Sequence, residues 1–302
     1  MGHSRLGGLP RTRKWMEVVG LIEHGASAAQ VANATLRAAE AGFLKAANDL
    51  GVTGSVWMLM QLPLAARSKD WVASLQNLGI DVKQAPTLME LQAKVTAAID
   101  AKLANSGRRS DLGELAQNAL AETLCNALGD RLPTLFSPNP ADVQGAIADC
   151  HTEKNFGSLA RDFFSRVTNH YLNYFLTKTY GNHVGEGRRF ATLSQVASFK
   201  DALKTHCYED AKIVERFSAE WRSKTNHEQK GIPWKEASDF TYGAMAKLVS
   251  ELKEGARDHG EQSGHSVRQR GYAGSPLGRQ KTDQVRDVGA ELEHPSRVAQ
   301  DP

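Results

Sequence analysis

The stretch that decides the fold class is FGSLARDFFSRVTNHYLNYF, residues 156–175. Its large apolar side chains recur every three or four residues, at Phe156, Leu159, Phe163, Val167, Tyr171, Tyr174 and Phe175. That spacing places them on one face of an α-helix, because an α-helix has about 3.6 residues per turn. The segment therefore predicts a long, well-buried helix.

The same spacing continues on both sides of this stretch. Toward the C-terminus it predicts one helix over 199–221 and a last helix from Pro233 to Leu252. Toward the N-terminus it predicts helices from about Trp15, Ser27, Ser68, Thr87 and Ser110. The apolar segment 55–67 fits either a buried helix kinked at Pro63 or a short strand with a turn, and we favour the helix.

Start and stop signals support these boundaries. Ser27 with Gln30, and Thr87 with Glu90, have the spacing of a capping box, which satisfies the free amides of a helix start. Asn139-Pro140 is an N-cap followed by proline at the first helical position. Gly79 follows an apolar stripe and is typical of a helix stop.

Composition excludes a large sheet. The chain has 302 residues, with 39 Ala and 30 Leu against 18 Val and 6 Ile. Alanine and leucine favour helices, whereas β-branched residues favour strands. We therefore predict an all-α protein, with about nine helices in a globular domain over residues 11–257.

The two ends of the chain differ from this domain. Residues 1–10 are rich in glycine and carry no acid, so we expect a flexible, basic N-terminal arm. Residues 258–302 lack apolar periodicity and predict a disordered tail. The proline-containing stretch 130–140 is the one plausible subdomain boundary.

Net charge, hydropathy and cysteine spacing limit the partners and the cellular compartment that we expect for this chain. The net charge of +3 is too even to indicate a dedicated nucleic-acid binder. The longest apolar stretch, 54–66, is shorter than the ~20 residues that a membrane span needs, so we expect no membrane partner. Three widely spaced cysteines, Cys125, Cys150 and Cys207, fit a reducing cytoplasm.

The N-terminal arm is the least generic feature. Removal of Met1 would expose Gly2, followed by His3, Ser4 and Arg5. Such an extended end can be captured by another protein through its backbone and free amine. We therefore consider Gly2, His3, Ser4 and Arg5 as partner-binding residues, and a plain leader peptide as the alternative.

Two Gly-Arg-Arg triplets suggest a second kind of site. Arg108 and Arg109 precede a helix start, and Arg188 and Arg189 end a glycine-rich loop that contains His183. Free backbone amides and the forked guanidinium groups of arginine bind phosphate, but solvated connecting loops explain both triplets adequately without such a site. If this site exists, the two triplets must be neighbours on one surface.

Other polar residues have simpler explanations. The candidates for metal binding or acid–base work are Cys150, His151, Glu153, His170, His183, His206, Cys207, Glu209 and Asp210. Their spacings match no zinc motif, and His170 and His206 fall on apolar stripes, where a hydrogen-bonded core histidine is expected. We expect no catalytic residue, no metal site and no cofactor.

These observations favour a non-enzymatic interaction protein. Helical proteins of this kind are typical components of bacterial multi-protein systems, such as those encoded by a defence operon. The expected partner is another protein, including an enzyme encoded in the same operon. The alternative is a nucleic-acid- or phosphate-binding protein, including a hydrolase, that uses the two Gly-Arg-Arg loops and His183.

Overall fold

The computed structural model describes residues 3–9, 12–106, 109–129, 131–132, 139–225 and 231–270. Among these residues nearly all regular structure is helical, which confirms the all-α prediction. The chain divides into two compact units, Met1–Glu261 and Gln262–Pro302. Both sides of the stretch 130–140 belong to the first unit, and residues 130 and 133–138 lie outside the described part.

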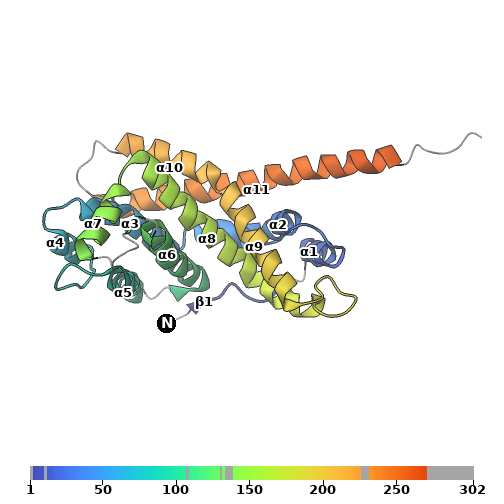
Figure 1. Ribbon diagram of the computed structural model, residues 1–302, viewed down its shortest axis with the longest axis horizontal. Helices are drawn as coiled ribbons and strands as arrows, with labels where there is room; N and C mark the ends of the chain where they lie inside the picture. Colours follow the sequence, from blue (N-terminus) through green and yellow to red (C-terminus); the bar gives the residue numbers. More distant parts are fainter. Residues whose placement is uncertain are drawn as a thin grey trace, which may run out of the picture. The chain divides into compact units, whose positions relative to one another are not determined.

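Figure 1 shows the order of the elements. Two short strands are β1 (His3–Ser4) and β2 (Arg109–Ser110), and η1 (Gly181–His183) is a 3-10 turn. The helices are α1 (Arg13–Glu23), α2 (Ala28–Ala46), α3 (Leu50–Ala66), α4 (Trp71–Asn77), α5 (Leu88–Ser106), α6 (Asp111–Gly129), α7 (Pro140–Asp149), α8 (Glu153–Tyr180), α9 (Leu193–Asp210), α10 (Lys212–Thr225) and α11 (Trp234–Arg270).

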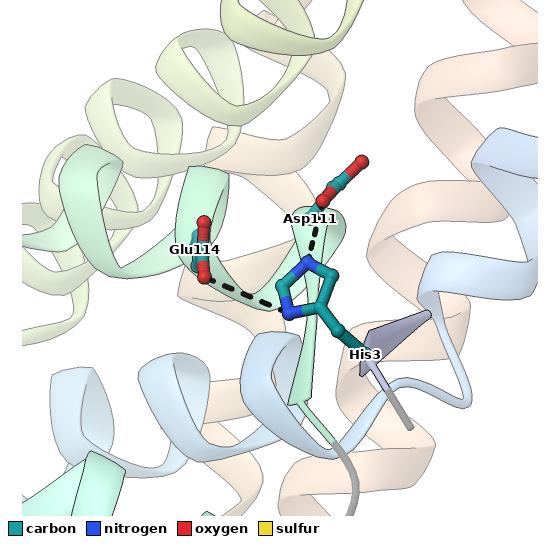
Figure 2. A group of neighbouring side chains, drawn as sticks. All are labelled: His3, Asp111 and Glu114. Carbon is teal, nitrogen blue, oxygen red and sulfur yellow. Dashed lines mark hydrogen bonds and ion pairs between the residues drawn. The ribbon is translucent and has the colours of Figure 1, made fainter. Parts of the chain in front are cut away.

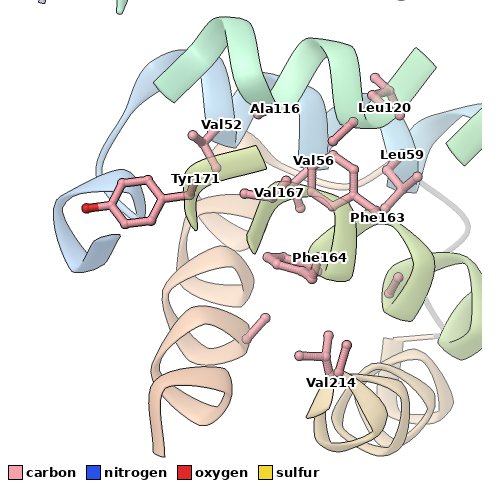
Figure 3. Packing of buried hydrophobic residues seen from close by; sticks show 14 of the residues in the cluster. Val52, Val56, Leu59, Ala116, Leu120, Phe163, Phe164, Val167, Tyr171 and Val214 are labelled. Carbon is pink, nitrogen blue, oxygen red and sulfur yellow. The ribbon is translucent and has the colours of Figure 1, made fainter. Parts of the chain in front are cut away.

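Helix α8 contains the deciding stretch and packs closely against α2, α6, α9 and α10 (Figure 1). Its aromatic rings also meet Trp15 on α1 and Phe240 on α11. Its Phe163 and Phe164 are fully buried, as are Val56 on α3 and Val214 on α10. Figure 3 shows these side chains meeting in one core. The aromatic stripe is therefore a central packing surface, as its spacing predicts.

Several local signals are confirmed. Ser27 forms a complete capping box with Gln30, and Asn139 forms one with Asp142 ahead of Pro140. Gly79 has a φ of 83°, the left-handed conformation that glycine adopts at helix ends. Residues 50–66 are helical with Pro63 inside, which decides between the two structures considered for that segment.

The single helix predicted over 199–221 is wrong, because the chain forms two helices there, α9 and α10, with Ala211 between them. No glycine or proline marks the break, and the apolar spacing continues across it. Both helices pack against α8. The break lets the chain turn and still follow the surface of α8, which is a property of packing rather than of local sequence.

The structure moves the start of the predicted C-terminal tail. We expected disorder from residue 258, but the backbone of α11 is helical through Arg270. Extending an existing helix needs no new nucleation, so polar residues can propagate it without burying apolar surface. Residues 271–302 of the expected tail lie outside the described part of the chain.

None of the described helices is both long enough and apolar enough to cross a lipid bilayer.

Candidate functional site

The N-terminal arm, residues 1–10, is described at residues 3–9, where it is extended and docked rather than free. Strand β1 pairs in parallel with β2, with His3 opposite Arg109 and Ser4 opposite Ser110. These two segments are more than a hundred residues apart in the sequence. The pairing brings the arm to the start of α6, which follows β2 directly.

Asp49 fixes the position of this helix start. One carboxylate oxygen accepts hydrogen bonds from the backbone amides of Gly51 and Val52, so Asp49 is the N-cap of α3. The other accepts the hydroxyl hydrogen of Ser110 at 2.6 Å. The Ser110 hydroxyl in turn accepts the amide of Gly113 at 2.9 Å. One carboxylate therefore joins the first turns of α3 and α6.

His3 reaches two carboxylates on the first turn of α6 (Figure 2). Its Nε2 lies 2.6 Å from Asp111 Oδ1, and its Nδ1 lies 3.9 Å from Glu114 Oε1. Asp111 and Glu114 are three residues apart, so they share one face of the helix. The imidazole ring is thus held between two acidic groups that come from a distant part of the chain.

The second oxygen of Asp111 is also occupied. Oδ2 accepts the backbone amide of Leu6 at 2.8 Å and lies 3.3 Å from the Tyr174 hydroxyl on α8. Burial acts to raise the pKa of Asp111, but the hydrogen bonds from Leu6, His3 and Tyr174 outweigh it and hold the pKa below its usual value. Asp111 is therefore an ionised anchor for the arm.

Further along the arm, the carbonyl of Gly7 is held by α8. It lies 3.0 Å from the Tyr174 hydroxyl and accepts a hydrogen bond from the Lys178 ammonium at 3.0 Å. The same ammonium lies 3.6 Å from the centre of the Tyr174 ring, which is a cation–π contact. Backbone groups of the arm thus have side-chain partners on both α6 and α8.

Past Gly7, the arm forms one wall of a cavity of about 1030 Å³. The cavity lies between the arm, α1, the end of α8 and η1, and it is lined by Gly8, Leu9, Trp15, Met16, Val19, Glu23, Lys178, Thr179, Asn182 and His183. His183 is buried there, with 6% of its surface exposed. The arm and His183, which the sequence presents as separate candidates, therefore meet at this cavity.

The arginines of the two triplets bind the chain's own groups. Arg109 forms an ion pair with Asp100 at 3.7 Å, and Arg188 donates to the carbonyl of Asn182 at 2.7 Å. Arg189 donates to the carbonyl of Ala26 at 3.2 Å. Arg108 and Gly2 lie outside the described residues. These contacts do not join the two triplets, so the shared surface they would need stays a prediction.

The remaining polar candidates sit in separate local networks. His170 pairs with Glu122 at 3.1 Å. His206 Nε2 lies 3.1 Å from Asp210 Oδ2 and 3.3 Å from Asn33 Oδ1. Cys150 and Cys207 are buried, and burial raises the pKa of both thiols. His170 and His206 are both half-buried beside a carboxylate, rather than in the core.

The His3, Asp111 and Glu114 cluster is the one grouping of metal-ligating side chains among the described residues whose ligand atoms lie within 4.8 Å of one another. The sequence pattern pointed to His3 as a partner-binding residue, but it did not point to Asp111 or Glu114. A partial signal existed, since Asp111 and Glu114 have the spacing of one helix face. Nothing in the sequence indicates that His3 lies beside them.

Comparisons with protein-family models, with curated proteins and with solved structures find no match for this chain.

Proposed function

We propose that this chain is a non-enzymatic interaction protein that recognises a partner protein through its docked N-terminal arm. The observation that carries the proposal is that the arm is anchored through its backbone and His3, while Ser4 and Arg5 remain exposed. An anchored peptide loses less conformational entropy on binding than a free one. The anchoring thus prepares the exposed arm residues for recognition.

The strand geometry supports the same function. Among the described residues β1 pairs with β2 alone, so the other edge of β1 has no strand partner there. An unpaired edge offers backbone donors and acceptors to an extended segment of another protein. Arg5 adds a charge next to this edge. A partner with an extended, acidic segment fits this surface.

The partner that we propose is another protein of a bacterial multi-protein system. An enzyme encoded by a neighbouring gene is one such partner. This step rests on the absence of recognisable catalytic motifs in the sequence and on the unusual arm. The genes beside this one test it directly. A neighbouring enzyme that co-purifies with the chain supports the proposal, and a gene without such neighbours argues against it.

Pull-down from the native host tests the role of the arm. We expect deletion of residues 2–10 to abolish capture of the partner, and Arg5→Ala to reduce it. Lys83→Ala is the matched control, because Lys83 is an exposed cation far from the arm in the sequence. Equal recovery with and without the arm would refute the proposal.

A further inference from the structure

We propose that His3, Asp111 and Glu114 bind one zinc ion, which fastens the N-terminal arm to the first turn of α6. The three side chains offer one imidazole nitrogen and two carboxylate oxygens within 4.8 Å of one another. Zinc sites use these donor types, and three protein ligands leave a fourth position for water or another ligand. Imidazole nitrogen favours zinc over calcium and magnesium, which prefer all-oxygen sites.

The local charge fits a divalent ion. Two anionic carboxylate ligands balance the double positive charge of one zinc ion. The neighbouring cation, Arg109, forms its ion pair with Asp100 rather than with either of these carboxylates. Both carboxylates lie in the first turn of α6. The helix dipole favours anionic groups at that end of the helix.

The surroundings of Asp111 select which of its oxygens would bind the metal. Oδ2 accepts the amide of Leu6 and lies beside the Tyr174 hydroxyl, so Oδ1 faces His3 Nε2 at 2.6 Å. Outer contacts of this kind orient the ligands of metal sites. Zinc would replace the hydrogen bond between Nε2 and Oδ1, and these two atoms would move apart to admit the ion. The imidazole would bind the metal through Nε2 in its neutral form, with its one proton on Nδ1.

Glu114 completes the ligand set by rotation. Its side chain is 62% exposed and lies 3.9 Å from the Nδ1 side of the ring, so it is not fixed by packing. Because one ligand atom of each of the three residues already lies within 4.8 Å of the other two, we infer that a change of the Glu114 side-chain conformation supplies the third ligand. The site therefore needs a side-chain movement but no refolding.

This inference deepens the proposed function, on which its biological meaning rests, because the ion would hold the arm that recognises the partner. His3 and Asp111 are 108 residues apart. A metal ion that links them stabilises the docked arm, and a chelator releases it. Zinc would therefore control whether the arm is docked when it meets its partner protein.

Calorimetric titration of zinc chloride into the tag-free, chelator-treated chain at pH 7 tests the site. We expect one site per chain, with affinity lowered about tenfold or more by His3→Ala and by Glu114→Gln. His24→Ala is the matched control, since the His24 side chain contacts the backbone of its own helix. No binding to the wild type, or equal binding to the His3→Ala variant, overturns the proposal.

Hydrogen exchange supplies a second measurement. Zinc should slow exchange of the Leu6 amide, which bonds to Asp111, in the wild type but not in the Glu114→Gln variant.

The experiments distinguish failure of the zinc site from failure of the proposed function. A chain that binds no zinc but needs its arm for partner capture overturns the zinc site alone. A chain that binds zinc through His3 but captures its partner without the arm overturns the proposed function alone.

Discussion

Asp210 has the most altered acidity among the described carboxyl groups for which a value is resolved. It lies at the end of α9, where burial first, and then the nearby carboxylates of Glu251 and Glu209, raise its pKa to about 7. His206 lies 3.1 Å away on the same helix. The protonation of Asp210 therefore changes near neutral pH.

The stability of the protein should depend on Asp210 in a defined pH range. The pKa of Asp210 in the folded state is above the ordinary aspartate value of 3.8, so the folded state binds the proton more tightly than the unfolded state. The free energy of unfolding should then fall as pH rises from about 4 to 7. We expect Asp210→Asn to raise Tm more at pH 8 than at pH 5.

Thermal melts of the wild type and the variant at both pH values check this expectation. Asp201→Asn is the matched control, because Asp201 is an exposed carboxylate on the same helix. A difference in Tm that is the same at both pH values would show that Asp210 does not titrate in this range.

At the scale of elements, α3 and α6 meet at two glycines. A Cβ atom at Gly51 would lie 2.5 Å from the Cα of Gly113, so this crossing has no room for a side chain. The same crossing contains Asp49 and Ser110, which set the start of α6. The position of Asp111 thus depends on how closely these two helices approach.

Gly51→Ala should therefore destabilise the protein by about 1–3 kcal/mol, because the clash is with backbone that cannot move aside. Gly145→Ala on α7 is the matched control, since no atom lies within 4 Å of its added Cβ. That change should be neutral or stabilising by up to about 1 kcal/mol. Urea unfolding measures both, and equal effects would contradict the close approach.

The loop around η1 gives a test of phosphate binding. Arg188 and Arg189 donate to backbone carbonyls of Asn182 and Ala26, so their guanidinium groups already have structural partners. We expect no salt-sensitive binding of nucleic acid in a filter assay at two salt concentrations. Binding that weakens steeply with salt and is lost in the Arg188→Ala, Arg189→Ala double variant would instead support the alternative function.

At the scale of the whole molecule, helix α11 belongs partly to each compact unit, because the division falls after Glu261. Its buried apolar positions, among the side chains described, end at Leu252. Truncation after Glu261 should therefore leave Tm unchanged to within about a degree.

Truncation after Ala246 is the contrasting variant. It removes Leu248 and Leu252, which are both buried. Losing one buried leucine side chain costs about 2–5 kcal/mol, so this variant should melt far lower or fail to fold. Calorimetry of both truncations checks the assignment, and a large loss of Tm on truncation after Glu261 would show that the distal segment is packed.

Local sequence determined most of the helices. The capping box of Ser27 with Gln30 and the N-cap at Asn139 each act within one helical turn. The spacing of apolar residues along α8 is enough to predict which face of that helix is buried. These signals depend on neighbours in the sequence, so they can be interpreted without a structure. The break at Ala211 depends on how α9 and α10 follow α8, and no local signal marks it.

The candidate site was determined by tertiary structure. The sequence drew attention to the arm and to His183, but the pairing of β1 with β2 and the contact of His3 with Asp111 join segments about a hundred residues apart. Two-residue strands have no periodicity to detect. Closing so long a loop depends on the contact of α3 with the start of α6 and on the contacts of the arm with α8. The sequence by itself determined the helices and their buried faces, because those follow from local geometry. The tertiary packing decided where the arm docks and which side chains surround His3.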